Sequence, residues 1–524
     1  MKKTIKVCIL TAGKGTRMGK LGVKLNKSLH AINGKAIISI IIQKFPSNSE
    51  FIIATGYLGF QVKAYLKIAH PKINFSFVDV KNYDGQGSGP GLSLLSCHDL
   101  LQDSFYFVSC DTLWSNNLNW ERSENWLGLA EIELSETENY CNAKIDKNNI
   151  IDLIDKKLVD DQAYKAFVGL CYIKDYKPFW KGIKKGHLEA GEHQISSGLR
   201  QLITESRLSY QMIDWEDVGD ETKFKKTASK YENFDFSKDD EVLYIINKKV
   251  IKFFSNPKIA EQRVHKSRLN QSVFPKITHF EKQFYSYSFL EGETLYKNND
   301  EIIFTRLLKW LDKSLWIDVS CDKIEIKKAC KIFYRDKTFE RISLYKKKYP
   351  TISNQKKINN MEVPNLQELL KKIPWESLFE GKKSFFHGDL QFDNIIYNKS
   401  TKNFHLIDWR QDFAGNINFG DVYYDLAKLY GGIILNYDYI KLNLFSFKEN
   451  EVSINFDFAQ RYSTNVYLKI LADFVNKKKL NLNKIKILVG LIYLNMAPLH
   501  KYPFDKMLYS LGKLTLDREL SKKL

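Results

Sequence analysis

Cysteine is scarce in this sequence and forms no recognisable pattern. The 524 residues include 7 cysteines, an odd number at scattered positions, and no two of them form a Cys-x-x-Cys pair. This distribution argues against a disulfide framework and against a zinc site built on paired cysteines. We therefore expect reduced thiols and a cytoplasmic location.

Long apolar runs are also missing. No stretch approaches the ~20 apolar residues of a membrane span, and the nearest candidate, residues 487–498 (ILVGLIYLNMAP), indicates a buried helix. The opening residues, MKKTIKVCILTAG, hold an apolar run too short for the core of a signal peptide. The sequence predicts a soluble protein with no membrane insertion.

Acidic residues are in deficit, since 61 Asp and Glu stand against 80 Lys and Arg and give a formal net charge of +19. The excess is nearly all lysine and is spread thinly along the chain. A nucleic-acid-binding protein is expected to show a basic stripe interleaved with aromatic residues, and the sequence has none. We expect a lysine-rich surface that favours phosphorylated ligands, and no specific nucleic acid partner.

The length of 524 residues predicts two or three domains. Apolar runs and turns alternate in the first part, as in an α/β fold. The polar segment Lys225–Asp240 then indicates a linker, beyond which a new strand pattern starts. We predict a first domain at residues 1–228, a linker at 229–240 and a second domain at 241–524.

A glycine-rich loop follows the first apolar run. Residues 5–10 (IKVCIL) predict a strand, and residues 11–19 read TAGKGTRMG. A strand, a glycine loop and a helix in this order place backbone amides around phosphate. The spacing misses the dinucleotide fingerprint, and the Gly-Lys-Ser/Thr of a Walker A loop is absent.

This loop resembles the A-G-x-G-T-R-M signature of sugar-nucleotide and phosphocholine nucleotidyltransferases. That family continues with Pro-Lys-x-Leu, and this chain has Asn26-Lys27-Ser28-Leu29, with Asn in the place of Pro. The resemblance implies a Rossmann-like nucleotidyltransferase domain in which Arg17 and Lys27 neutralise the triphosphate. It also implies phosphate binding by four loop residues: Ala12, Gly13, Gly15 and Thr16.

Two aspartates complete the resemblance. Asp111 follows a buried-strand pattern, and the carboxyl ends of central strands are where open α/β sheets bind ligands. The resembled family uses that Asp as a metal ligand together with a second Asp before the last helix, which here is Asp217. Two carboxylates on one Mg²⁺ would join the α-phosphate and the incoming phosphate oxygen. The family further implies Gly87 in the base and sugar pocket and Lys156 at the acceptor phosphate, although Lys157 is equally placed.

The second part of the chain contains a different catalytic pattern, FFHGDLQFDNIIYNKSTKNFHLIDWR at residues 385–410. Asp389 is suited to accept the proton of an attacking hydroxyl, Asn394 to offer an amide oxygen to a metal, and Asp408 to bridge a metal to nucleotide phosphates. Protein kinases have the same order of groups, an HRD-x-x-x-x-N loop followed by a metal-binding Asp after a short hairpin.

Here Gly replaces the Arg of HRD, and Asp408-Trp409-Arg410 replaces DFG. This variant resembles the aminoglycoside phosphotransferase and choline kinase family, and it implies a bilobal, protein-kinase-like α+β domain. Such a domain needs a strand Lys on the ATP phosphates, held by a helix Glu, and Lys252 and Glu261 are the candidates. Asp421 and Asp425, in a G-D-x-x-x-D-L-A segment, are expected to be structural.

The two resemblances together predict consecutive reactions. The kinase would phosphorylate a small alcohol with ATP, and the first domain would transfer CMP from CTP to the product and release pyrophosphate, with Mg²⁺ in both domains. The nearest family analogue makes CDP-choline for bacterial surface polysaccharides, which implies an alcohol of the choline or ethanolamine type. The expected partners are this alcohol and the nucleoside triphosphates. The sequence leaves open whether the protein forms a homo-oligomer.

Two alternatives remain. One is a sugar or polyol kinase joined to a UTP-, GTP- or CTP-dependent NDP-sugar pyrophosphorylase. Trp409, Tyr423 and Tyr424 would suit part of an aromatic cage for a quaternary ammonium, but core packing explains them equally well. The other is a non-catalytic nucleotide-binding module, which two complete sets of metal ligands oppose.

Overall fold

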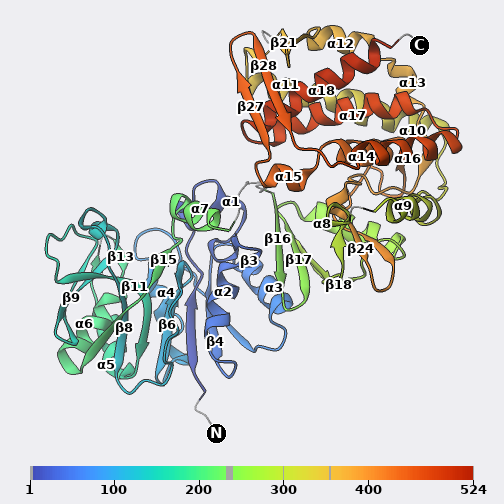
Figure 1. The fold of residues 1–524 in the computed structure, drawn as a ribbon. Coiled ribbons are helices and arrows are strands. Elements are labelled where there is room, and N and C mark those ends of the chain that lie inside the picture. The colour runs from blue at the N-terminus through green and yellow to red at the C-terminus, as the bar shows by residue number, and fades with distance from the viewer. Residues whose placement is uncertain (1–3, 190, 232–239, 299, 353–355, 523–524) are drawn as a thin grey trace. The chain divides into compact units, whose positions relative to one another are not determined.

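The computed structural model describes residues 4–189, 191–231, 240–298, 300–352 and 356–522 (Figure 1). The chain forms two compact units. Among the described residues, the first unit comprises 4–189, 191–231, 240–256 and 283–286, and the second comprises 257–282, 287–298, 300–352 and 356–522. Most of the predicted linker, residues 232–239, lies outside the described residues, and the predicted domain limits stay a prediction.

A nine-stranded sheet forms the centre of the first unit. Four neighbouring strands are parallel: β5 (Phe75–Asp79), β4 (Glu50–Thr55), β1 (Lys6–Leu10) and β6 (Phe105–Ser109). The sheet then continues in the order β11 (Tyr164–Ile173), β8 (Asn125–Ala130), β14 (Leu208–Met212), β10 (Asn149–Asp155) and β9 (Cys141–Asp146), with β11 antiparallel to β6.

Helices cover both faces of this sheet. Successive side chains of a strand point to opposite faces, and β1 accordingly buries alternate residues in two different cores. Val7 and Ile9 belong to one core with α2 (Ile37–Lys44) and α3 (Gly59–Ala69). Cys8 and Leu10 belong to a second core with α5 (Tyr176–Lys185) and α6 (Ser196–Glu205). This arrangement confirms the predicted Rossmann-like α/β fold and leaves the carboxyl edge of the parallel strands for a ligand.

Shorter elements complete the first unit. The helices are α1 (Leu21–Lys24), α4 (Pro90–Leu95) and α7 (Glu221–Ser229); the strands are β2 (Ala31–Ile32), β3 (Lys35–Ala36), β7 (Thr112–Trp114), β12 (Leu188–Glu189), β13 (Glu192–His193) and β15 (Trp215–Asp217). Helix α7 runs through the start of the polar segment Lys225–Asp240, because Asp220 caps its first turn through the backbone N–H of Lys223.

A hairpin of β16 (Glu241–Ile246) and β17 (Lys249–Phe254) also belongs to the first unit. The ring of Tyr244 lies 4.8 Å from that of Tyr65 in α3, and its hydroxyl donates to the Leu29 carbonyl at 2.7 Å. The backbone N–H of Ile245 donates to the Gly34 carbonyl at 2.7 Å. The hairpin therefore buries apolar surface of α3 and extends the first unit past residue 228.

The second unit is mainly helical. The longer helices are α8 (Pro257–Leu269), α9 (Glu301–Ser314), α10 (Lys323–Cys330), α11 (Lys337–Lys348), α14 (Val422–Ile434), α16 (Thr464–Lys477), α17 (Leu482–Met496) and α18 (Phe504–Leu520). The shorter ones are α12 (Leu366–Lys372), α13 (Trp375–Phe379) and α15 (Tyr437–Lys441). Helices α17 and α18 lie side by side (Figure 1), and α17 also contacts α14.

Leu482–Leu499 is long and apolar enough to cross a membrane by composition, but 61% of it is buried inside the protein. Its contacts with α14 and α18 explain that burial, and they favour the sequence-based interpretation of a core helix. All seven cysteines are free.

The strands of the second unit are short. They are β18 (Ile277–Glu281), β20 (Glu293–Thr294), β21 (Lys357–Ile358), β22 (Met361–Glu362), β23 (Lys383–Ser384), β24 (Ile395–Asn398), β25 (Asn403–Leu406), β26 (Gly420–Asp421), β27 (Phe445–Glu449) and β28 (Ser453–Phe458); β19 (Phe284–Ser288) begins in the first unit. The hairpin of β24 and β25 lies within the predicted catalytic segment. It connects Asn394, just before β24, to Asp408, shortly after β25.

Candidate functional sites

The carboxylates of Asp111 and Asp217 converge in the first unit. Asp111 follows β6, and its carbonyl accepts the backbone N–H of Val218 at 3.0 Å. Strand β15 pairs with β7 so that Asp217 lies opposite Thr112. A Cβ built on Gly219 would lie 2.9 Å from Asp111 Oδ2 and 2.9 Å from Asp217 Oδ1, so the two oxygens face one small space that only glycine leaves open.

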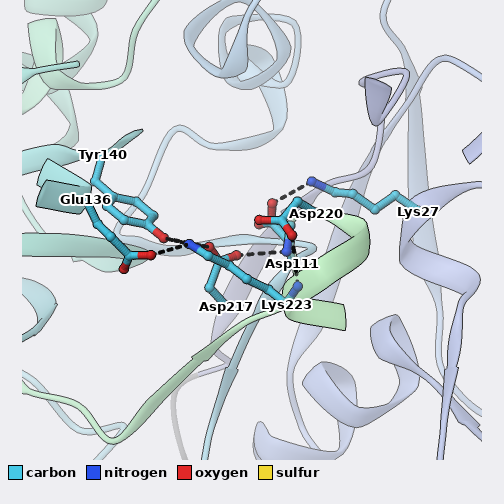
Figure 2. Close-up of polar contacts among 8 residues, drawn as sticks. Lys27, Asp111, Glu136, Tyr140, Asp217, Asp220 and Lys223 are labelled. Carbon is cyan, nitrogen blue, oxygen red and sulfur yellow. Dashed lines mark hydrogen bonds and ion pairs between the residues drawn. The ribbon is translucent and has the colours of Figure 1, made fainter. Parts of the chain in front are cut away.

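Lys27 completes this group from the opposite side of Asp111 (Figure 2). Its Nζ lies 2.5 Å from Asp111 Oδ2. Burial acts to lower the pKa of Lys27, but the attraction of Asp111 outweighs burial, so the pKa is raised. For Asp111, burial acts to raise the pKa and Lys27 holds it below its ordinary value. Both side chains are therefore charged at neutral pH, as a site that binds a polyphosphate and a cation requires.

Asn26 fixes the position of Lys27. Its side-chain amide donates to the carbonyls of Thr11 at 3.0 Å and Tyr57 at 2.7 Å, and its Oδ1 accepts the backbone N–H of Ser28. Its own backbone N–H donates to Gln61 Oε1 at 2.9 Å. A proline at this position would have neither the side-chain amide nor the N–H, so the departure from the family pattern is compensated by a buried hydrogen-bond network.

We predict that Asn26→Ala lowers the free energy of unfolding by ~2–4 kcal/mol, because it leaves several buried partners unsatisfied. Urea unfolding of the full chain measures this effect. The matched control is Asn117→Ala, since Asn117 is exposed, and it is expected to change the free energy by less than ~0.5 kcal/mol. A loss for Asn26→Ala no larger than that of the control would refute the role of Asn26.

Lys223 and Tyr140 contact Asp217, and Glu136 contacts Lys223; the sequence patterns did not single out any of these three residues. Lys223 Nζ lies 3.0 Å from Asp217 Oδ2 and 3.7 Å from Glu136 Oε1, and the Tyr140 hydroxyl donates to Asp217 Oδ2 at 2.7 Å (Figure 2). Lys223 also donates to the Tyr140 hydroxyl, a residue 83 positions away. Burial acts to lower the pKa of Lys223, but Tyr140 and Asp217 raise it above its ordinary value.

A cavity of about 180 Å³ lies beside these groups, and it brings four predicted residues together: Arg17, Asp111, Lys156 and Asp217. Lys156 adopts a left-handed backbone with φ of 48°, and its Nζ lies 2.7 Å from Glu192 Oε2. Lys157 is not among the described residues that line the cavity.

The loop residues Ala12, Gly13, Gly15, Thr16 and Gly87 do not line this cavity either. Gly15 has a left-handed backbone, and a Cβ there would lie 3.3 Å from Lys27 Cβ, so the loop packs closely on the Lys27 segment. The Gly87 N–H donates to the Gly191 carbonyl at 2.8 Å, next to the hairpin of β12 and β13. The predicted roles of these residues in nucleotide binding stay predictions.

The donor set near Gly219 fits Mg²⁺. Carboxylate oxygens are the ligands that Mg²⁺ prefers, and it commonly takes one or two of them together with phosphates and water. Asp111 and Asp217 would hold the ion, and it would supply charge neutralisation at the reacting phosphates. The described residues contain no group of three or more His, Cys, Asp or Glu that would hold a metal without such additional ligands.

The second unit brings together Asp389, Asn394 and the start of the Asp408 turn. The Asn394 side-chain amide donates to the Asp389 carbonyl at 2.8 Å, and the Ile407 N–H donates to the Asn394 carbonyl at 2.9 Å. Since its Nδ2 is used in this way, the amide oxygen of Asn394 is the atom left to meet a cation. Asp408 has a φ of 57°, uncommon outside glycine, and its Oδ1 lies 3.6 Å from Arg263.

Asp425 holds the loop that presents Asp389. Its carboxylate accepts the backbone N–H groups of His387 at 2.8 Å and Gly388 at 2.7 Å. Burial raises the pKa of Asp425 to about 6, and these two N–H groups oppose that rise. Asp421 caps α14 and accepts the Tyr334 hydroxyl at 2.7 Å. The contacts of both aspartates are those of structural residues.

The donor set of Asn394 and Asp408 also fits a hard cation, since both offer oxygen. They would hold Mg²⁺ against the nucleotide phosphates, where it would neutralise charge.

Lys252 is buried in β17, and its Nζ lies 2.9 Å from Glu241 Oε1. Lys252 belongs to the first compact unit and Glu261 to the second, so the predicted ion pair between them stays a prediction.

The three aromatic residues considered for a cage lie in different surroundings. Trp409 is fully buried and donates its Nε1–H to the Arg263 carbonyl. Tyr424 stacks on Tyr334, whereas Tyr423 accepts the Asn481 N–H and lies under the Lys484 ammonium at 4.2 Å. These contacts favour core packing over a shared quaternary ammonium site.

Comparison with known proteins matches residues 7–118 to a family described as the MobA-like NTP transferase domain. The bifunctional protein GlmU of Methanococcus maripaludis is 25% identical over 215 residues, which cover 40% of this chain and 50% of that protein. GlmU of Methanococcus vannielii is 25% identical over 218 residues, which cover 40% and 51%. The chain thus spans about half the length of the curated relatives it matches.

Solved structures similar to this chain include the inositol-1-phosphate CTP transferase from T. maritima, at 13% identity and a TM-score of 0.35, covering 44% of this chain and 96% of that one. A UDP-glucose pyrophosphorylase from Acinetobacter baumannii has 12% identity and a TM-score of 0.36, covering 44% and 94%. The family match thus covers residues 7–118, which hold the parallel strands β1, β4, β5 and β6 and the candidate residue Asp111.

Proposed function

We propose that the first unit transfers a nucleoside monophosphate from a nucleoside triphosphate to a phosphorylated small alcohol. The observation that carries this proposal is the convergence of Asp111 and Asp217 on the space above Gly219, with Lys27 ion-paired to Asp111 and Arg17 in the adjoining cavity. This site combines oxygen ligands for a cation with fixed positive charge for phosphates, as phosphoryl transfer requires.

In this reaction a phosphate oxygen of the phosphorylated alcohol forms a bond to the α-phosphorus, and the bond from that phosphorus to the bridging α–β oxygen breaks. Pyrophosphate leaves, and an NDP-activated alcohol is the product. Lys27 and Arg17 would neutralise the triphosphate and stabilise the charge that develops on the leaving pyrophosphate. Lys223, held by Asp217 and Tyr140, would orient the Asp217 carboxylate.

We further propose that the second unit is an ATP-dependent kinase that supplies the phosphorylated alcohol. The proximity of Asp389 and Asn394, and the backbone bond that joins Asn394 to the Asp408 turn, support this proposal. Asp389 would accept the hydroxyl proton, while Asn394 and Asp408 would hold a cation on the ATP phosphates. Synthesis of the intermediate in the same chain would raise its local concentration.

The identity of the nucleotide and the alcohol forms the finer part of the proposal. CTP and an alcohol of the choline or ethanolamine type follow from the sequence resemblance. The alternative is a sugar or polyol with CTP, UTP or GTP. Trp409, Tyr423 and Tyr424 lie in separate surroundings and do not form a common cage for a quaternary ammonium, which favours a sugar or polyol as the alcohol.

The test uses the full chain with ATP, Mg²⁺ and one of CTP, UTP or GTP, against a panel of alcohols. We expect ADP release with an accepted alcohol, and pyrophosphate release that requires both the second nucleotide and the phosphorylated alcohol. If no combination of nucleotide and directly supplied phosphorylated alcohol releases pyrophosphate, the nucleotidyltransferase proposal is contradicted. Pyrophosphate release without any ADP release would contradict only the kinase proposal.

A further inference from the structure

Cationic side chains gather near Asp389 in the second unit. Lys428 Nζ lies 2.8 Å from Asp389 Oδ1. Lys337 Nζ lies 4.1 Å, and Arg410 Cζ 4.9 Å, from the centre of the Phe333 ring. Lys337 and Arg410 therefore lie against the same ring, and the charges of Arg410, Lys428, Arg341 and Asp389 all act on the pKa of Lys337.

Several structural elements converge to build this cluster. Lys337 and Arg341 are one helical turn apart on α11, directly after a π-helical turn at Lys331–Asp336. Single π-helical turns inside α-helices occur frequently at functional sites. Lys428 comes from α14, and the backbone N–H of Arg410 donates to the His387 carbonyl at 2.9 Å, beside the loop that carries Asp389.

The cluster has more positive than negative charge. Among the described residues, Lys428 pairs with Asp389, but Lys337, Arg341 and Arg410 form no ion pair. Arg410 Nε is buried and has no hydrogen-bond partner in the described part of the chain. Burial and then repulsion from Arg410, Lys428 and Arg341 lower the pKa of Lys337. Burial and repulsion thus disfavour the charged form of Lys337, and an anion bound among these side chains would offset both effects and favour its ammonium form.

The surrounding aromatic rings shape the cluster without offering a place for a cation. Phe333 packs on Phe413 at 4.3 Å and on Tyr424 at 4.9 Å between ring centres. Lys337 and Arg410 already lie against the Phe333 ring, so a quaternary ammonium would find this ring occupied and would add a further positive charge. A ligand with a negative group would instead satisfy the unpaired ammonium and guanidinium groups.

We propose that the alcohol phosphorylated by the second unit carries an anionic group, a carboxylate or a phosphate, which Lys337, Arg341 and Arg410 bind while the hydroxyl meets Asp389. This proposal rests on the proposed kinase function. In the step, the hydroxyl oxygen forms a bond to the γ-phosphorus of ATP, the bond from that phosphorus to the β–γ bridging oxygen breaks, ADP leaves, and the hydroxyl proton passes to Asp389.

The first experiment compares small alcohols that differ in charge. ADP release by the full chain is measured with glycerate and glycerol 3-phosphate as anions, glycerol as the neutral member, and choline and ethanolamine as cations. We expect kcat/KM at least ~10-fold higher for an anionic alcohol than for its neutral counterpart. Equal or higher kcat/KM with choline or glycerol would overturn the proposal and leave the kinase function intact.

The second experiment removes charge from the cluster. The double variant Lys337→Met, Arg341→Met is compared with Lys347→Met, an exposed lysine on the same helix. We expect KM for the anionic alcohol to rise at least ~10-fold in the double variant while KM for ATP stays within ~2-fold, and the control to change neither. A rise in KM for ATP alone would assign the cluster to the nucleotide and overturn the proposal.

A binding measurement separates failure of this proposal from failure of the kinase proposal. Isothermal titration of the full chain with glycerate and with inorganic phosphate needs no turnover. Loss of one binding event in the double variant, with folding checked by circular dichroism, would support an anion site even if no alcohol releases ADP. Identical titrations of wild type, double variant and control would overturn the anion site.

Discussion

Asp111→Asn and Asp217→Asn are each expected to lower the rate of pyrophosphate release by ~10²–10⁴-fold, with the phosphorylated alcohol supplied directly. Both carboxylates face the space over Gly219, so an amide at either position removes a charged oxygen from the proposed cation site. Asp111→Asn also leaves the Lys27 ammonium, now 2.5 Å from a carboxylate, without its anionic partner.

The matched control is Asp214→Asn, an exposed aspartate just before β15. It is expected to retain pyrophosphate release within ~2-fold, because exposed substitutions away from a site have small effects. ADP release with an accepted alcohol checks that the second unit of each variant is folded, and circular dichroism of the full chain checks the first unit. Retention of more than a tenth of the wild-type pyrophosphate release by either site variant would contradict the proposed role of the aspartate pair.

The sequence predicted the frame of this first site well. A strand, a glycine loop and an Asp at a strand end are local patterns, and the parallel sheet brings local patterns to one edge. Asp111 and Asp217 accordingly meet beside Arg17. Lys223 and Tyr140 were missed, because the contact joins positions 83 residues apart and no short pattern encodes it.

Two other features could not be derived from sequence patterns. Alternation of apolar residues predicts the strands β16 and β17, but not that Tyr244 packs on Tyr65 in the first unit. Asn26 was visible only as a departure from a family pattern, since its buried hydrogen bonds involve Thr11, Tyr57 and Gln61. In both cases the missing information is the tertiary partner, which propensity and periodicity do not contain.

The second site shows the same division. The spacing of Asp389, Asn394 and Asp408 was readable because loop and hairpin are contiguous in the chain. The positive charge near Asp389 could not be predicted from the sequence. Lys337 and Arg341 lie on a helix about 50 residues earlier, and in the sequence they look the same as solvent-exposed lysines and arginines. Trp409, Tyr423 and Tyr424 were candidates for a quaternary ammonium cage, whereas their contacts in the fold are those of core packing.

Asp389→Asn is expected to lower ADP release by ~10²–10⁴-fold with the alcohol that the panel identifies, because an amide does not accept the hydroxyl proton. It also leaves Lys428, which is 8% exposed, without its carboxylate partner at 2.8 Å. Pyrophosphate release from the phosphorylated alcohol is expected to stay unchanged, since that reaction uses residues of the other unit.

The matched control is Asp473→Asn, the same substitution at an exposed aspartate on α16 of the second unit, which is expected to keep ADP release within ~3-fold. The pair Asp111→Asn and Asp389→Asn then tests the order of reactions. With alcohol, ATP and the second nucleotide together, Asp111→Asn should accumulate phosphorylated alcohol, and Asp389→Asn should form no NDP-alcohol until phosphorylated alcohol is added. Formation of NDP-alcohol by Asp389→Asn from the unphosphorylated alcohol would show that the first unit does not depend on the second for its substrate.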